Sequence, residues 1–221
     1  MILACYEFQT PLEIKENRIT VFTVENPLFY RQFIMDIIAQ TQNCSSRFTL
    51  SDDKETYLFS KNVELITDIF NLTFDSRFFQ NKINQIVLEE SRNYSTEIQN
   101  LINNINNLGS EVLSSLNFEA NYTPISDIGG ILKLFGFYLD AETMTIPERL
   151  IEYLNFLNLF SDKKLFIILN LKSIITQKEY DEFIKLLQYK KINVLLIEAK
   201  ISEITNKNEI TKIIDNDLCE F

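Results

Sequence analysis

The chain has 221 residues, of which 46% are hydrophobic and 18 are phenylalanine, so it has ample material for a packed core and is not predicted to be disordered. Its net charge of −10 opposes nucleic-acid binding by the surface as a whole, because phosphate contacts need Lys and Arg. The absence of histidine excludes Ser-His-Asp triads, Cys-His pairs and histidine-ligated metal sites.

The location of the protein is predicted from its cysteines and its apolar runs. Cys5, Cys44 and Cys219 are widely spaced and odd in number, which favours buried thiols in a reducing cytoplasm over disulfides. The first residues contain no basic leader, and the longest apolar run, near Phe166, is too short to cross a bilayer. We therefore expect a cytoplasmic protein with no membrane partner.

The first 60 residues are predicted to be rich in strands. Short strands are expected at 2–8, 12–14 and 19–24, and Pro27 is expected to open an amphipathic helix. Residues 47–50 alternate in polarity, and 57–59 are expected to pair near them.

The middle of the chain is predicted to be helical. Residues 63–70 are expected to form a short helix, and apolar residues at gaps of three and four from Phe79 to Leu108 predict a long one that Gly109 ends. About thirty helical residues span roughly 45 Å, which favours a projecting arm that packs on a partner helix or another subunit. A helical hairpin packed on itself is the alternative.

The last hundred residues combine helices with buried strands. Helices are expected at 112–116, at 131–134 with an end at Gly136, and from Pro147 to Phe160 with Thr145 near the cap. A short strand is expected at 137–139. The apolar runs at 165–171 and 194–198, with a helix at 177–189 between them, predict a right-handed parallel crossover. Residues 217–221 are expected to form an edge strand.

This order of elements predicts an α/β fold with an insertion. Residues 1–60 and 147–221 are expected to form one α/β domain, and 61–146 an inserted helical domain. The domain lacks a P-loop, because the segment after 19–24 contains no glycine and the four glycines lie at 109, 129, 130 and 136. Adjacent carboxylates such as Glu89 and Glu90 diverge by about 100° on a helix, so they are expected to be solvated.

The basic residues are unevenly distributed. Residues 163–200 contain eight lysines and four acids, so this segment carries +4 and the rest of the chain −14. Lysine pairs precede both predicted buried strands of this segment. We expect the basic residues of this region and of the domain junction to line one concave surface that holds a nucleic-acid backbone without reading its sequence; the candidates are Lys133, Arg149, Lys163, Lys164 and Lys172.

Several segments in this order resemble the Csn-two family, the spacer-acquisition accessory proteins of type II-A CRISPR systems. They are PLEI at 11–14, ELITDIFNLTFDS at 64–76, ILKLFGFYLDAETMTIPERLIEYLNFL at 131–157, KKLFIILNL at 163–171 and NVLLIEAK at 193–200. The similarity covers nearly the whole chain, with the matching length and order of elements, and indicates a divergent branch of the family.

The resemblance implies a protein that is not an enzyme. It implies a homotetrameric ring, assembled through the helical domain, which encircles double-stranded DNA, prefers free ends and slides along the duplex. The partners that it implies are the CRISPR integrase proteins and the effector nuclease. By position, Lys133 and Arg149 match basic sites near the family's inter-domain region, and Lys163 and Lys164 match its basic pair before the buried strand.

One feature of the family is weakly represented in this chain. Many members have a dense acidic stretch between the domains that binds structural calcium, whereas residues 117–130 keep only Glu119 and Asp127 as acids. Calcium takes six to eight oxygen ligands, usually with several carboxylates, so we expect no required cofactor. If calcium does bind, Glu119 and Asp127 are its candidate ligands. Two alternatives remain: a protein-interaction scaffold of the adaptation complex that binds no DNA, and a metal-dependent nuclease that uses scattered carboxylates.

Overall fold

The computed structural model describes residues 1–141 and 143–221, without the side chain of Lys133. It divides into two compact units, one formed by 1–72 with 143–221 and the other by 73–142. The first unit is of the α/β class, as predicted from the sequence, and the second is helical. The division falls at 72/73 rather than 60/61, because residues 63–66 are a strand of the first unit and not the predicted helix.

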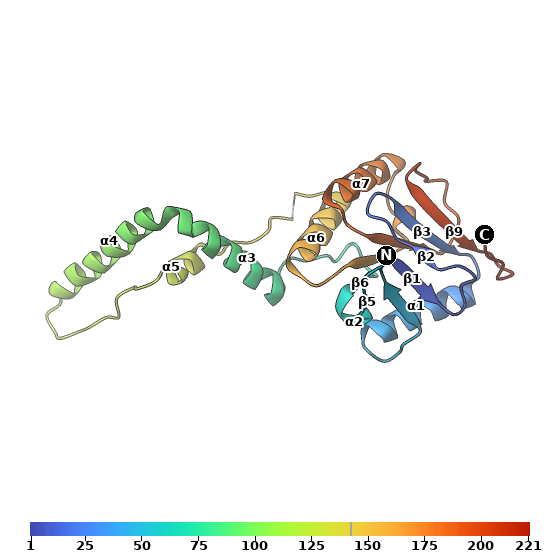
Figure 1. Ribbon diagram of the computed structural model, residues 1–221. Helices are drawn as coiled ribbons and strands as arrows, with labels where there is room; N and C mark the ends of the chain where they lie inside the picture. Colours follow the sequence, from blue (N-terminus) through green and yellow to red (C-terminus); the bar gives the residue numbers. More distant parts are fainter. Residues whose placement is uncertain (142) are drawn as a thin grey trace. The chain divides into compact units, whose positions relative to one another are not determined.

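The α/β unit contains two sheets (Figure 1). The larger is a five-stranded parallel sheet in the order β6 (Val63–Ile66), β7 (Leu165–Leu169), β8 (Val194–Glu198), β3 (Ile19–Val24), β9 (Glu209–Ile214). The smaller is antiparallel, in the order β2 (Leu12–Glu13), β1 (Ile2–Cys5), β4 (Phe48–Ser51), β5 (Thr56–Tyr57). The predicted parallel crossover from β7 through helix α7 (Gln177–Lys190) to β8 is confirmed. The predicted edge strand at 217–221 is wrong: the edge strand is β9, and the later residues turn back to bridge Ile214 with Glu220.

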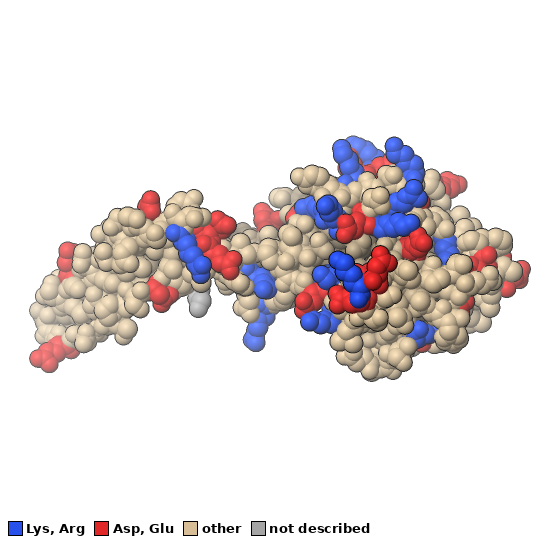
Figure 2. All heavy atoms as spheres, viewed as in Figure 1, with Lys and Arg blue, Asp and Glu red and all other residues tan. Residues whose placement is uncertain are grey.

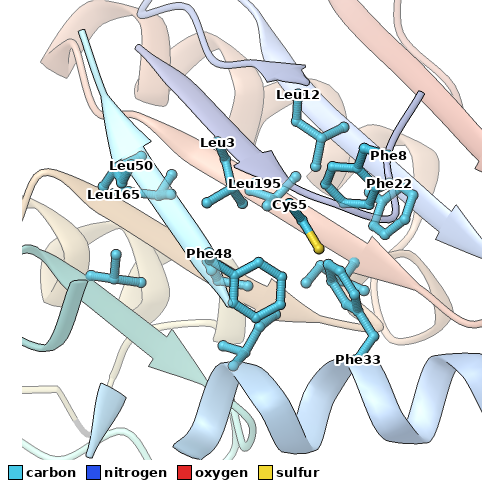
Figure 3. Packing of buried hydrophobic residues seen from close by; sticks show 14 of the residues in the cluster. Leu3, Cys5, Phe8, Leu12, Phe22, Phe33, Phe48, Leu50, Leu165 and Leu195 are labelled. Atoms are coloured by element: carbon cyan, nitrogen blue, oxygen red, sulfur yellow. The ribbon is translucent and has the colours of Figure 1, made fainter. Parts of the chain in front are cut away.

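The main core lies between one face of the parallel sheet, the smaller sheet and helix α1 (Pro27–Thr41). Phenylalanine rings dominate it, and Figure 3 shows them meeting in the space between the strands and the helix. Phe22 of β3 contacts Phe8 and Phe33 with ring centroids 5.2 and 5.1 Å apart, and Phe33 contacts Phe48 at 5.1 Å. Edge-to-face packing of this kind adds to the free energy gained by burying the rings.

Helices α6 (Ile146–Phe160) and α7 (Gln177–Lys190) lie on the other side of the parallel sheet from α1 (Figure 1). Each begins with a capping box: Thr145 with Glu148 in α6, and Thr176 with Glu179 in α7. The predicted cap at Thr145 is therefore confirmed. A short helix, α2 (Phe59–Asn62), and two 3₁₀ turns, η1 (Arg92–Tyr94) and η2 (Leu171–Ser173), complete the chain's minor elements.

The helical unit consists of α3 (Arg77–Ser91), α4 (Ser95–Ser114) and α5 (Ile128–Phe135). The predicted stop at Gly109 is wrong, since α4 continues through it. A Cβ at Gly109 would lie 3.1 Å from the ring of Tyr122, so this glycine lets the returning segment 117–127 approach the helix. Gly136 does end α5, in the left-handed conformation with φ 61°. Residues 137–139 are irregular, so the predicted strand there is also wrong.

Candidate nucleic-acid interface

Basic residues precede every strand of the five-stranded parallel sheet. Because parallel strands begin at the same side of a sheet, these residues gather there, and we call them the basic edge: Lys61 before β6, Lys163 and Lys164 before β7, Lys190 and Lys191 before β8, Arg18 before β3, and Lys207 before β9. Neighbouring strands lie about 4.8 Å apart, so the basic edge extends over about 19 Å.

Hydrogen bonds hold the loops of the basic edge side by side. Lys164 N donates to Asn62 O at 2.7 Å, and Asn193 Nδ2 donates to Lys164 O at 3.2 Å. Gln188 Nε2, near the end of α7, donates to Asn17 O at 2.6 Å. A side chain in these loops therefore projects from a backbone that its neighbours fix.

A hollow of about 670 Å³ opens at the basic edge. Its polar lining contains cations, amides, acids and one phenol: Lys15, Lys164, Asn17, Asn193, Glu16, Asp52 and Tyr57. Tyr57 donates a 2.5 Å hydrogen bond to Asp52, which lowers the pKa of Asp52 to about 2 and raises that of Tyr57 to about 12. The aspartate keeps its negative charge at neutral pH, and Lys15 is paired with Glu13 at 2.6 Å, so the exposed Lys164 is the lining residue best able to attract a phosphate.

Some cations of the basic edge are paired with acids and others are not. Lys163 is half-buried, with its Nζ 3.0 Å from Glu64 and 2.7 Å from Val63 O, and Lys61 and Lys190 pair with Asp162 and Glu152. Within the described residues, no ion pair holds the exposed side chains that are best placed to meet a phosphate: Arg18, Lys164, Lys191 and Lys207. In Figure 2, Lys and Arg side chains gather over α7 and the adjoining part of α6, with acidic side chains among them.

The structure does not bring the predicted DNA-binding residues of the α/β unit, Arg149, Lys163, Lys164 and Lys172, onto one surface. Lys172 follows β7, whereas Lys163 and Lys164 precede it, so Lys172 lies at the opposite end of that strand from the other two lysines. It is also only 6% exposed: its Nζ lies 3.0 Å from Glu209 and 2.8 Å from Ile204 O. We therefore correct the prediction that Lys172 contacts DNA, because a buried ammonium that is paired with a carboxylate cannot reach a phosphate.

Arg149, which belongs to the same unit, is not on the basic edge either. Arg149 is half-buried in the first turn of α6, whereas Lys163 follows the end of that helix, so about 16 Å of helix separates them. Lys133 lies on α5 of the helical unit, and its side chain is outside the described residues. Of the five predictions, Lys164 has the exposure that a phosphate contact needs, and Lys163 is beside it.

The two acids of segment 117–130, Glu119 and Asp127, lie within the helical unit. Asp127 caps α5 by accepting from Gly130 N at 3.1 Å, and Glu119 is exposed. Among the residues that the structure describes, no group of three or more His, Cys, Asp or Glu side chains is arranged to hold a metal ion. Cys44 and Cys219 are exposed, which corrects the prediction of three buried thiols, and only Cys5 is buried.

A second surface lies on helix α4. Apolar residues follow one another there at alternating gaps of four and three, and all but the half-buried Ile98 are exposed. We call them the α4 seam: Tyr94, Ile98, Leu101, Ile105, Leu108 and Val112. The neighbouring face of the helix is already covered, since Asn106 exchanges two 2.9 Å hydrogen bonds with Ile125 and receives one of 2.6 Å from Tyr122. The seam is therefore an apolar stripe that its own unit leaves uncovered.

Comparison with known proteins agrees with the resemblance seen in the sequence. A family model described as CRISPR-associated protein (Cas_Csn2) matches residues 40–218. No curated protein matches the chain. Among the described residues, no helix is both long enough and apolar enough to span a bilayer. The matched residues include the whole basic edge except Arg18.

Proposed function

Because the chain belongs to the Csn2 family of CRISPR-associated proteins, we propose that it is a non-catalytic protein that binds double-stranded DNA during spacer acquisition in the cytoplasm. The observation that carries this proposal is the basic edge, where cations from five parallel strands meet on an otherwise acidic protein. Phosphate contacts of this kind position a duplex without reading its sequence.

The net charge of −10 requires an explanation if the protein binds DNA. We infer a ring-shaped homotetramer in which the basic edges face inward and the acidic surfaces face solvent. A closed ring of identical subunits repeats one surface around its axis, so every basic edge would meet the same duplex. A ring of this kind loads at free DNA ends and slides.

The α4 seam supports assembly through the helical unit. Written as a heptad, its a positions are Ile98, Ile105 and Val112, and its d positions include Leu101 and Leu108. β-Branched residues at a with leucine at d favour two-stranded coiled coils. Each seam would thus be covered by the seam of another subunit.

Binding to linear and closed-circular duplexes of the same sequence tests the proposal. A ring that loads at ends retains linear DNA and binds closed circles poorly, and its affinity falls steeply with salt because counterions are released. Absence of binding to linear DNA at low salt would overturn the proposal, and cleavage of either DNA with magnesium or manganese would point to a nuclease.

A scaffold that binds no DNA is the second candidate, and one surface favours it. Leu134, Phe135 and Tyr138, at and just after the end of α5, are 83, 65 and 71% exposed. Apolar surface of this kind marks protein-interaction sites, and the integrase proteins and effector nuclease are the partners we propose for it. Pull-down of those partners by a protein that does not retain DNA would favour this function.

A further inference from the structure

Tyr189 is an exposed aromatic side chain beside the basic edge. It is the second-last residue of α7 and is 86% exposed, whereas Leu187, two residues earlier, is buried against the sheet. Two residues turn an α-helix by about 200°, so the Tyr189 ring projects away from the core. Within the described part of the chain, no hydrogen bond or ring contact holds this side chain.

The surroundings of Tyr189 are cationic. Lys190 and the exposed Lys191 follow it directly, with Lys190 paired to Glu152 at 3.3 Å. The exposed Lys185 lies one turn before it on the same face of the helix. The adjacent Gln188 is bonded to Asn17 of the loop before β3, so this end of α7 is fixed against the basic edge. An aromatic ring among cations presents a base with a stacking partner and its phosphate with a charge partner.

We propose that Tyr189 stacks on an unpaired base at the end of the DNA that the basic edge holds. This inference rests on the proposed function and adds recognition of a single-stranded overhang to it. Bases within a duplex already stack on both sides, so the ring gains a partner only where a base is unpaired. Stacking does not depend on base identity, because every base has a π-face.

The proposal predicts a preference that disappears with the ring. Stacking of one base on an aromatic residue strengthens binding by roughly 5- to 150-fold. We expect the unaltered protein to bind a duplex with a three-nucleotide overhang about tenfold more tightly than the same duplex with abasic overhang positions. Tyr189→Ala should abolish this difference, and Tyr189→Phe should keep it.

Fluorescence anisotropy of labelled duplexes measures these affinities, and 2-aminopurine in the overhang reports stacking by a change in its emission. Tyr6→Ala is the matched control, because Tyr6 is 84% exposed in the same unit and makes a cation–π contact with Arg47. Tyr189→Ala should leave the salt dependence unchanged, because it removes no charge.

The outcomes separate this inference from the proposed function. If all the variants bind overhang and abasic duplexes equally well, or if Tyr189→Ala keeps the preference, DNA binding stands and Tyr189 has no role in it. If the unaltered protein binds none of the duplexes at low salt, both proposals fall. Loss of the preference in Tyr6→Ala as well as in Tyr189→Ala would also overturn the assignment to Tyr189.

Discussion

Lys172 was predicted to contact DNA, but the structure buries its side chain in the α/β unit. Its ion pair with Glu209 is buried, with both side chains about 5% exposed, and its ammonium lies 5.0 Å from the ring of Tyr180. Removal of one partner of such a pair leaves the other charge buried without compensation. The lysine therefore serves the stability of the α/β unit.

We predict that Lys172→Gln lowers the free energy of unfolding by about 3 kcal/mol. Urea denaturation measures the loss, and DNA affinity of the folded variant should stay within about twofold of the unaltered protein. Lys164→Gln is the comparison, with nearly unchanged stability and weaker DNA binding. The opposite pattern would return Lys172 to the DNA-binding set.

Glu198 links the stability of the same region to pH. It is 3% exposed at the end of β8, and burial raises its pKa to about 7, although Lys172 N donates a 3.1 Å hydrogen bond to its carboxylate. The folded state then holds the proton more tightly than the unfolded chain, where a glutamate has its usual pKa of 4.5. This stabilisation is complete at pH values below the pKa of Glu198 in the unfolded chain. It is lost as the pH rises through about 7, the pKa of Glu198 in the folded protein.

Between about pH 4, below the pKa of the unfolded chain, and about pH 8, above that of the folded protein, the expected contribution of Glu198 is about 3 kcal/mol. Glu198→Gln removes the titration, so the difference in unfolding free energy between the two proteins should change over this range. Denaturation curves at several pH values measure it. A difference that is independent of pH would contradict the raised pKa.

Local roles such as helix capping were easier to predict from the sequence than the positions of side chains on the folded surface. The capping role of Thr145 follows from its spacing to Glu148. The opposite locations of Lys164 and Lys172 were not predicted: both were expected on one surface, although they flank one predicted strand and so lie at its opposite ends. The burial of Lys172 does not follow from the local sequence, since its partner Glu209 lies 37 positions away along the chain.

At the scale of elements, strands and helices with strong apolar patterns were predicted correctly. The predicted strands at 19–24 and 194–198 match β3 and β8, and the helix after Pro27 matches α1. The segment 63–66 was predicted as a helix because its short apolar run suits either structure. Pairing of Val63 and Ile66 with Leu165 and Ile168 of β7 selects the strand, and the local sequence does not contain that information.

The α4 seam is expected to hold subunits together, and a charge placed in it tests this role. Ile105→Asp places a charge in the centre of the apolar stripe, so we expect the assembly to dissociate into smaller species. Asn103→Asp adds the same charge to an exposed position of the same helix outside the seam and should leave the assembly intact. Light scattering during size-exclusion chromatography distinguishes them, and equal masses for the two variants would contradict the role of the seam.

At the scale of the whole chain, the residues before the parallel strands differ in charge from those after them. Cations precede all five strands, whereas acids follow several of them: Asp68 after β6, Glu25 after β3, and Asp215 and Asp217 after β9. Lysines that follow helix C-termini, such as Lys191, also interact favourably with the helix dipole, so the basic edge stabilises the fold as well. The excess of lysine in 163–200 indicated a basic surface, and the strand order determines where it lies.

The salt dependence of binding tests most directly whether the basic edge holds DNA through phosphate contacts. Lys164→Gln with Lys191→Gln should reduce the slope of log affinity against log salt by about 1.8 per subunit on duplex DNA. Lys178→Gln with Lys200→Gln changes the net charge equally at exposed positions outside the basic edge and should leave the slope nearly unchanged. Equal slopes for the two double variants would contradict the claim.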